Sequence, residues 1–130
     1  MMSELFKFEL ITPERSILSL DVSEVIIPAY EGQMTILKDH IPIITFLKPG
    51  IIKFVNTKAS KSFLIDEGTV EFNNNSLLIL TENAIEIEKF DKSSIPEIIK
   101  SLTHRMSKDD ISDSEKFLIS TKIDTLKELN

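Results

Sequence analysis

The sequence predicts a β-sandwich over about ninety residues, followed by two helices. Short apolar segments alternate with polar residues up to Phe90, and turn residues interrupt them about every eight to ten positions. Helical periodicity begins only after Phe90, where two longer amphipathic segments follow. We therefore expect a chain of the β plus α class, with a strand-rich domain over residues 1–90 and a helical domain over residues 91–130.

Short apolar segments separated by turn residues are the candidate strands. They lie at residues 6–10, 18–22, 25–27, 34–36, 43–47, 51–55, 62–65, 69–72 and 77–80. Proline, asparagine, aspartate and glycine mark turns at residues 12–15, 48–50, 66–68 and 73–75. The three glycines, Gly32, Gly50 and Gly68, are isolated, and we expect each to occupy a turn that needs a positive φ.

Two capping boxes predict the helix starts. Ser94 and Glu97 have the spacing of the first box, with Pro96 in the first turn, and Ser112 and Glu115 form the second. Residues 107–111 separate the two helices. The apolar stripe of the first helix is Ile95, Ile98, Ile99, Leu102 and Met106, and that of the second is Ile119, Ile123, Leu126 and Leu129. We expect the hairpin to be closed by Ile98, Leu102, Met106, Ile119, Ile123 and Leu126.

Composition excludes several classes of function. The 130 residues contain 15 basic and 21 acidic side chains, a net charge of −6, which disfavours nucleic acid as a partner. Without cysteine there is no disulfide, thiolate nucleophile or cysteine metal site. The start of the chain lacks the apolar run of a signal peptide. The longest uncharged stretch, residues 41–47, is far shorter than the about twenty residues of a membrane helix.

Catalytic chemistry has few candidate residues. The two histidines, His40 and His104, lie in different parts of the chain, without metal-ligand spacing or a nucleophile motif. The isolated glycines form no phosphate-binding loop. Glu86 and Glu88 are expected on one solvent-exposed face of a strand. The residues therefore favour a binding or assembly role over an enzyme, and we expect no cofactor and no metal.

Several segments resemble the epsilon-subunit family of bacterial F-type ATP synthases, whose mitochondrial equivalent is called delta. They are LITPER at residues 10–15, VIIPAYEGQMTILKDHIP at 25–42 and LKPG at 47–50. Residues 68–72 and 80–85 continue the resemblance, which covers most of residues 5–88. It implies an N-terminal ten-stranded β-sandwich followed by a C-terminal two-helix antiparallel hairpin, the architecture that periodicity also predicts.

The resemblance implies a noncatalytic central-stalk subunit. In this family the sandwich binds the gamma subunit and sits on the ring of c subunits, so that proton-driven ring rotation turns gamma. The contact with the c ring is implied at Tyr30, Glu31, Gly32 and Gln33, and the contact with gamma at His40, Ile41 and Pro42. The family often has a Pro-Gly pair where Lys38 and Asp39 stand here. A peripheral location on the cytoplasmic face of the inner membrane, reached only through the complex, is also implied.

The resemblance leaves two roles open for the helical hairpin. In many members it can extend along gamma and block ATP hydrolysis, and in some it folds back and binds ATP. Contact of the hairpin of this chain with the alpha/beta hexamer is also implied. Asp91 remains from the ATP-binding motif, but Ser94 stands where the motif has an arginine. The loss of that guanidinium disfavours ATP binding. We expect weak or absent inhibition, and the alternative is an ATP-sensing regulatory subunit whose hairpin changes conformation on binding nucleotide.

Overall fold

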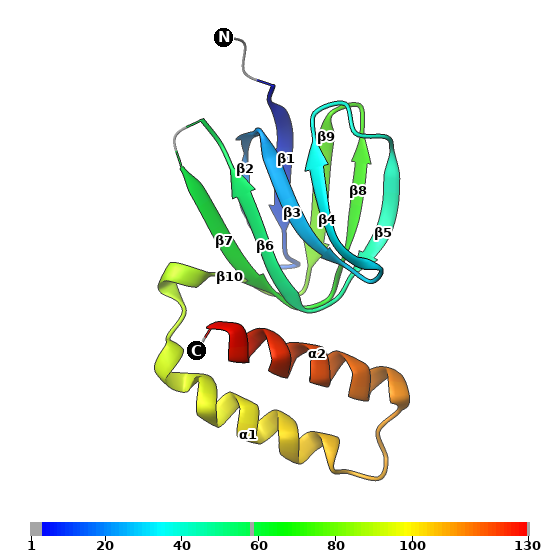
Figure 1. Cartoon of the computed structure of the whole chain (residues 1–130), viewed down its shortest axis with the longest axis vertical. Helices are drawn as coiled ribbons and strands as arrows, with labels where there is room; N and C mark the ends of the chain where they lie inside the picture. Colours follow the sequence, from blue (N-terminus) through cyan, green and yellow to red (C-terminus); the bar gives the residue numbers. More distant parts are fainter. Residues whose placement is uncertain (1–3, 58, 130) are drawn as a thin grey trace.

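The computed structural model describes residues 4–57 and 59–129, which form a β-sandwich and two helices (Figure 1). The strands are β1 (Phe6–Ile11), β2 (Ser16–Val22), β3 (Glu24–Ala29), β4 (Gly32–Leu37), β5 (Ile43–Leu47), β6 (Gly50–Val55), β7 (Ser60–Ile65), β8 (Gly68–Asn73), β9 (Ser76–Thr81) and β10 (Ala84–Glu86). Two 3-10 turns, η1 (Ile87–Lys89) and η2 (Lys92–Ser94), precede α1 (Ile95–Met106) and α2 (Asp113–Leu129). The predicted fold class is confirmed, and the nine predicted segments all form strands.

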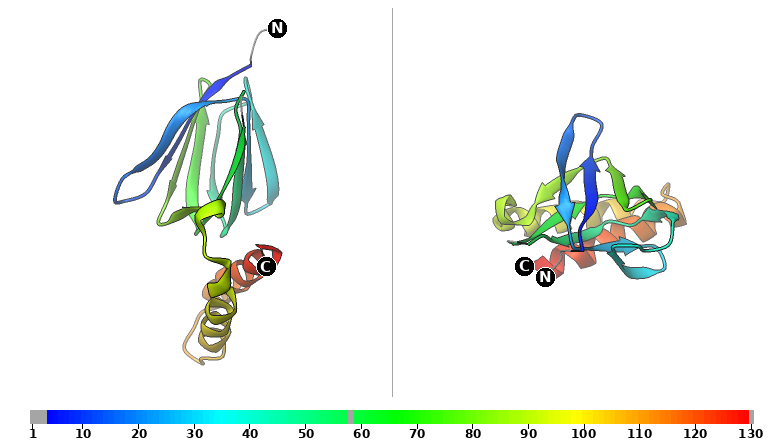
Figure 2. Two further views of the ribbon diagram at one scale, coloured as in Figure 1. Left: turned by 90° about the vertical axis from the view of Figure 1, so that its left-hand side faces the viewer. Right: turned by 90° about the horizontal axis from the view of Figure 1, so that it is seen from above.

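The ten strands belong to one sheet that folds into two layers (Figures 1 and 2). Its order is β10-β7-β6-β3-β5-β8-β9-β1-β2, with β4 beside β3. The pairing of β1 with β9 is parallel, whereas the other pairings within the described residues are antiparallel. Ala29 and Leu47 form the register pair between β3 and β5, where the sheet passes from one layer to the other.

Apolar side chains from both layers meet between them. The buried members of this core are Phe6, Phe8, Leu10, Val22, Val25, Ile27, Ala29, Ile36, Leu47, Ile52, Phe54, Phe63, Ile65, Val70, Phe72, Leu77 and Ile79. The ring of Phe8 in β1 meets that of Phe54 in β6 edge to face, with centroids 5.6 Å apart. Alternate residues of a strand share a face, so this core determines which side chains point outward.

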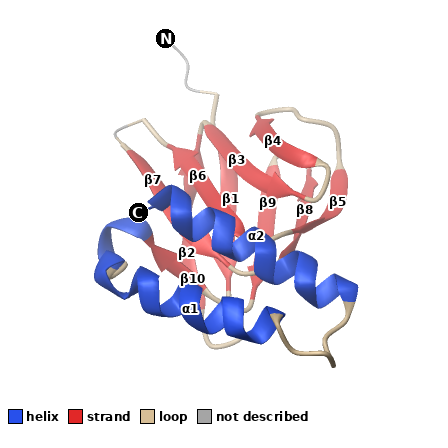
Figure 3. Ribbon diagram, turned by 60° about the horizontal axis from the view of Figure 1, so that its bottom comes forward, coloured by secondary structure: helices blue, strands red, loops and turns tan. Residues whose placement is uncertain are grey.

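The two helices lie together beneath one end of the sandwich, with α2 between the sandwich and α1 (Figures 1 and 3). They attach through a second, separate cluster of buried residues formed by Leu64, Ile95 and Leu126. Leu64 comes from β7, where three consecutive residues, Phe63 to Ile65, are buried. Both faces of β7 are therefore covered by other parts of the protein. The sandwich core covers its inner face, and the hairpin covers its outer face.

The first predicted capping box is wrong. In the second, the hydrogen bond that the serine side chain accepts is confirmed. Ser94 lies at the N-cap of α1, but its hydroxyl donates to the backbone oxygen of Asp91 at 2.6 Å and makes no cap hydrogen bond. The turn η2 leads directly into α1, so Ser94 already has a helical backbone and lacks the extended geometry of an N-cap. By contrast, the backbone N–H of Glu115 donates to the Ser112 hydroxyl at 3.1 Å.

Positive φ explains only one of the three glycines. Gly32 has a φ of +134°, but Gly50 and Gly68 do not belong to the positive-φ residues. A Cβ on Gly50 would lie 2.8 Å from the Cβ of Pro28, and a Cβ on Gly68 would overlap the backbone oxygen of Leu80. These two positions therefore require glycine because neighbouring strands approach closely.

The expected placement of Glu86 and Glu88 on one solvent face of a strand is also wrong. Strand β10 ends at Glu86, and Glu88 lies in the 3-10 turn that follows. The Glu86 carboxylate lies 3.3 Å from the ammonium of Lys61 and 3.5 Å from that of Lys89, and its side chain is only 14% exposed. Strand β10 pairs with β7 over three residues only, and the chain leaves the sheet after Glu86.

We predict that Gly68→Ala lowers the free energy of unfolding by about 2 kcal/mol, because the new methyl group meets the Leu80 backbone inside the β8–β9 pairing. Urea denaturation of the two proteins measures the change. The matched control is Glu67→Ala in the exposed preceding turn, which should alter stability by less than about 0.5 kcal/mol. Equal stability of Gly68→Ala and the parent would contradict the role of the close approach.

Candidate functional site

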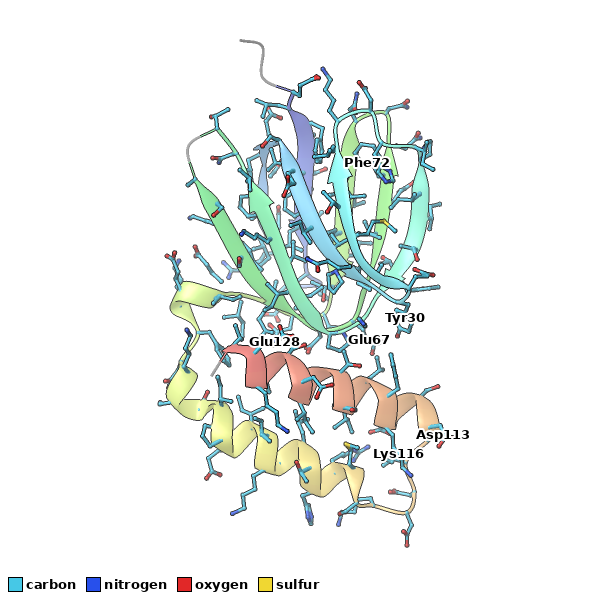
Figure 4. The ribbon with its side chains drawn as sticks, viewed as in Figure 1. Tyr30, Glu67, Phe72, Asp113, Lys116 and Glu128 are labelled. Carbon is cyan, nitrogen blue, oxygen red and sulfur yellow. The ribbon has the colours of Figure 1, made fainter. Side chains whose placement is uncertain are left out.

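The turn between β3 and β4 presents Tyr30, Glu31, Gly32 and Gln33 at the end of the sandwich that faces the helices (Figure 4). Tyr30 is 43% exposed, and Glu31 and Gln33 are exposed. Gly32 meets the backbone requirement of this turn with its positive φ, and its Cβ position is open space. The turn therefore offers an aromatic ring, a carboxylate and an amide to a partner.

The loop between β4 and β5 lies at the opposite end of the sandwich. His40 makes ring contact with Phe72, at a centroid distance of 5.9 Å, and Figure 4 shows Phe72 far from Tyr30. The Nδ1 atom of His40 lies 2.7 Å from the backbone oxygen of Ile41, a turn interaction. Ile41 is 72% exposed, and Pro42 is also exposed. The two predicted contact regions are thus at separate ends and do not form one site.

An apolar surface runs from this loop along β5 to the neighbouring strands. We call it the outer apolar face, formed by Ile44, Phe46 and Leu80, and the exposed Ile41 lies in the loop that precedes β5. Ile44 is 81% exposed and Phe46 is 66% exposed. Phe46 is paired with Thr69 and Thr69 with Leu80, so these side chains share one face of the sheet. Exposed apolar residues in a contiguous group indicate an interaction surface.

Sequence reasoning missed this face, although the sequence carries a signal for it. Strand β5 reads Ile-Ile-Thr-Phe-Leu and β9 reads Ser-Leu-Leu-Ile-Leu-Thr, so both are apolar on their two faces. The sandwich core covers only one of these faces. A continuous apolar run in an antiparallel sheet therefore indicates that something else covers the outer side.

Acidic residues flank one end of the outer apolar face. A shallow groove of about 520 Å³ lies between Phe46 and Leu80, and Glu67 and Glu82 are on its rim. Glu71 is also exposed on β8, directly paired with Ile44 of β5. An apolar surface with an acidic rim is complementary to a partner that carries apolar and basic side chains.

Three contacts tie the hairpin to the sandwich or close it on itself. Phe117 of α2 packs against Tyr30, with ring centroids 5.9 Å apart, and both rings are half exposed. Lys122 of α2 lies 2.9 Å from the carboxylate of Asp66 between β7 and β8. Within the hairpin, the guanidinium of Arg105 binds the Glu115 carboxylate at 2.7 Å, and this hydrogen bond raises the pKa of Arg105. Two of these contacts hold α2 against the sandwich, and the third holds the two helices together.

The predicted hairpin residues occupy different environments. Leu126 is fully buried in the second cluster, and Ile98 and Leu102 pack against that cluster partly buried. Ile119 is 8% exposed, whereas Met106 and Ile123 are of intermediate exposure. Ile95, Ile99 and Leu129 also contribute to the cluster, together with Leu64 of the sandwich. Sequence periodicity placed the stripe on the inner side of the hairpin, but it could not identify Leu64 as its partner.

The described residues present little catalytic chemistry. The Asp91 carboxylate accepts hydrogen bonds from the backbone N–H and the hydroxyl of Ser93, so it caps the turn η2. His104 is exposed in the last turn of α1. Within residues 4–57 and 59–129 there is no group of three or more His, Asp or Glu side chains that could hold a metal ion. Nor is any helix in this part of the chain long and apolar enough to span a membrane.

Comparisons of sequence identify relatives along the whole chain. A family model described as the β-sandwich domain of the ATP synthase delta/epsilon chain matches residues 5–87. A protein of Pelagibacter ubique named ATP synthase epsilon chain is 48% identical over 130 residues, which cover 99% of this chain and 100% of the relative. One of the same name from Allorhizobium ampelinum is 33% identical, covering 95% of this chain and 88% of the relative.

Solved structures share the fold. A chain in the mitochondrial ATP synthase of Euglena gracilis superimposes with a TM-score of 0.79 at 17% identity, covering 99% of this chain and 81% of that chain. A chain in the mitochondrial ATP synthase central stalk and c ring of Tetrahymena thermophila gives a TM-score of 0.64 at 18% identity, with coverage of 94% and 93%. At these identities the likeness concerns the fold.

We predict that Phe117→Ala makes Tyr30 more accessible to acrylamide quenching of its fluorescence. The chain has one Tyr and no Trp, so the emission reports on this contact. Loss of an aromatic pair worth about 0.5–1.5 kcal/mol raises the undocked fraction of the hairpin by about two- to twelvefold. Lys116→Ala, the exposed neighbour in α2, is the control and should leave quenching unchanged. Equal quenching of both variants and the parent would show that the hairpin does not cover Tyr30.

Proposed function

We infer the function of this chain from its family: it belongs to the delta/epsilon chains of ATP synthase, and its named relatives are epsilon chains. We propose that it is a noncatalytic subunit of the central stalk of an F-type ATP synthase. In this role it couples the rotation of the proton-driven c ring to the gamma subunit, and hence to ATP synthesis. The observation that carries the proposal is the outer apolar face beside the loop His40 to Pro42, on a sandwich of the family's fold.

Gamma is the proposed partner of the loop and the outer apolar face. Ile41 of the loop and Ile44 of β5 are the most exposed large apolar residues among those described, and they are close in the chain. Burial of such side chains provides the main free energy of a stable interface. The acidic rim at Glu67 and Glu82 adds preference for a basic partner surface.

The c ring is the proposed partner of the turn Tyr30 to Gln33. Because this turn and the His40 loop lie at opposite ends of the sandwich, the chain has room for both partners at once. Glu31 and Gln33 are exposed even with the hairpin docked beside Tyr30. A carboxylate in an exposed turn suits a polar, salt-sensitive contact with basic loop residues.

The proposed location follows from these partners. The chain would lie on the cytoplasmic face of the inner membrane and be peripheral, held there by the c ring and gamma. The described residues contain no helix that could span a membrane, which agrees with attachment through other subunits.

The hairpin is proposed to be a weak or vestigial inhibitor of ATP hydrolysis. Extension toward the alpha/beta hexamer would expose Leu126 and Ile95, which are now buried against Leu64, and break the pair of Lys122 with Asp66. Exposure of each large apolar side chain costs about 1.5–3 kcal/mol, which favours the compact hairpin.

The alternative, an ATP-sensing hairpin, has less support. The Asp91 carboxylate is engaged with Ser93, and Ser94 provides no cation for a phosphate at the motif's arginine position. Titration of the chain with ATP distinguishes the two roles, because saturable binding would favour the sensor.

We predict that Phe46→Asp weakens binding of gamma to the full chain by about tenfold or more, because a buried carboxylate without a partner costs more than about 1.4 kcal/mol. Affinity is measured by titration of purified gamma. Phe46 is 66% exposed, so the variant should fold normally. Thr35→Asp, an exposed strand position in the other layer, is the control and should bind like the parent. Parental affinity of Phe46→Asp would remove the outer apolar face from the interface.

We also predict that removal of residues 91–130 leaves ATP hydrolysis by the assembled complex nearly unchanged. The hairpin attaches through a cluster separate from the sandwich core, so the truncated chain retains the core and the proposed contact surfaces. Hydrolysis rates of complexes with the full and truncated chains are compared at equal occupancy. A rate increase of about tenfold, equivalent to about 1.4 kcal/mol of barrier, would identify the hairpin as a true inhibitor.

A further inference from the structure

Asp39 has an unusual backbone conformation at the entrance to the His40 loop. Its φ is +67°, in the left-handed region, which residues other than glycine rarely adopt and which aspartate reaches mainly where its polar side chain forms a hydrogen bond. Its backbone N–H donates to Oδ1 of Asn75 at 2.7 Å, and Nδ2 of Asn75 donates to Oδ1 of Asp39 at 3.0 Å. A single asparagine side chain therefore holds both the backbone and the side chain of Asp39, from a position 36 residues along the chain.

We propose that Asn75 is a positioning residue for the interaction loop of residues 38–42, acting through Asp39. This inference rests on the proposed function, in which His40, Ile41 and Pro42 contact gamma. Asn75 itself makes no contact with the partner in this proposal. It stabilises the left-handed Asp39 and thereby sets the direction in which the chain presents Ile41.

The contacts around Asp39 show how this positioning works. The backbone N–H of His40 donates to the Leu37 oxygen at 3.1 Å, which closes a turn over Asp39. The His40 ring then meets Phe72 edge to face, on β8 and near the Asn75 turn. With the histidine packed on the sandwich, Ile41 points outward and is 72% exposed. A loop held in its bound conformation loses less entropy on binding.

The turn that contains Asn75 permits a clean experiment. Asn74 and Asn75 both have positive φ, 51° and 57°, and they connect the paired residues Asn73 and Ser76 of β8 and β9. This is the conformation of a type I′ hairpin turn, for which Asn-Gly is a preferred sequence. Asn75→Gly therefore removes the amide without straining the turn, whereas alanine would add strain.

The experiment measures gamma affinity and stability for full-length Asn75→Gly beside the parent. We expect affinity to fall about fivefold because the hydrogen bonds that preorganise the loop are lost, while the urea midpoint falls only slightly and the variant stays fully folded in water. Asn74→Gly is the matched control in the same turn, since the side chain that binds Asp39 is that of Asn75, and it should keep parental affinity. Amide exchange of Asp39 in the isolated chain should accelerate in Asn75→Gly alone.

A second variant, Asp39→Gly, tests whether Asn75 acts on the loop through Asp39. Glycine adopts a positive φ without strain and lacks the carboxylate that accepts from Nδ2 of Asn75, so in an Asp39→Gly chain only the backbone N–H contact with Asn75 remains. We expect Asn75→Gly to cause a smaller loss of affinity there than in the parent background. An equal loss in both backgrounds, or parental affinity and amide exchange in Asn75→Gly, would overturn the proposal. If the parent fails to bind gamma, the proposed function fails, and the amide exchange of Asp39 still decides whether Asn75 holds the loop.

Discussion

Aromatic and aliphatic packing between the two sheet layers is the interaction on which the rest of the structure depends. Phe8 of β1 meets Phe54 of β6 between the layers, and Phe6 of β1 meets Phe72 of β8 on the core side of one layer, so strands far apart in the sequence are held in register. Because a one-residue shift would turn every side chain of a strand to the other face, the same packing directs Ile44 and Phe46 outward. The outer apolar face is therefore a consequence of the core, and its side chains are held in place by the residues behind them.

The hairpin depends on the sandwich in a different way. Its cluster around Leu126 and Ile95 meets the sheet at Leu64 and is separate from the main core. Parts of a protein that share few buried contacts open with a smaller free energy than the global unfolding. The ion pair of Lys122 with Asp66 and the ring contact at Tyr30 are partly exposed and add little individually. By this argument, separating the hairpin from the sandwich costs less free energy than unfolding the core.

The strands and helices could be predicted from the sequence because period and turn residues are local signals. The first capping box failed because η2 precedes α1 and gives Ser94 a helical backbone, which the Ser-x-x-Glu spacing alone does not reveal. Gly50 and Gly68 were predicted to be turn residues with a positive φ, but they begin strands β6 and β8, and their close approaches to Pro28 and Leu80 arise from strand pairing. The outer apolar face was recognisable in β5 as a strand that is apolar on both sides, but only once its inner side was known to be filled. The bond of Asn75 with Asp39 joins residues 36 apart, and no local pattern predicts it.

The proposed role in the central stalk would require the chain to transmit torque between its partners, so the proposed contact surfaces would need to be rigid relative to one another. The turn at Tyr30 and the loop at His40 are the two ends of β4 and its neighbours, and the sheet between them is hydrogen bonded along its length. A tight turn lies at each end of β4. One turn contains Gly32, and the other contains the left-handed Asp39, which Asn75 holds by hydrogen bonds. A flexible loop at either end would absorb rotation as local bending before it moved the partner. The polar bonds at the loop ends therefore have the same effect as the apolar core, because both keep the distance between the two proposed contact regions constant.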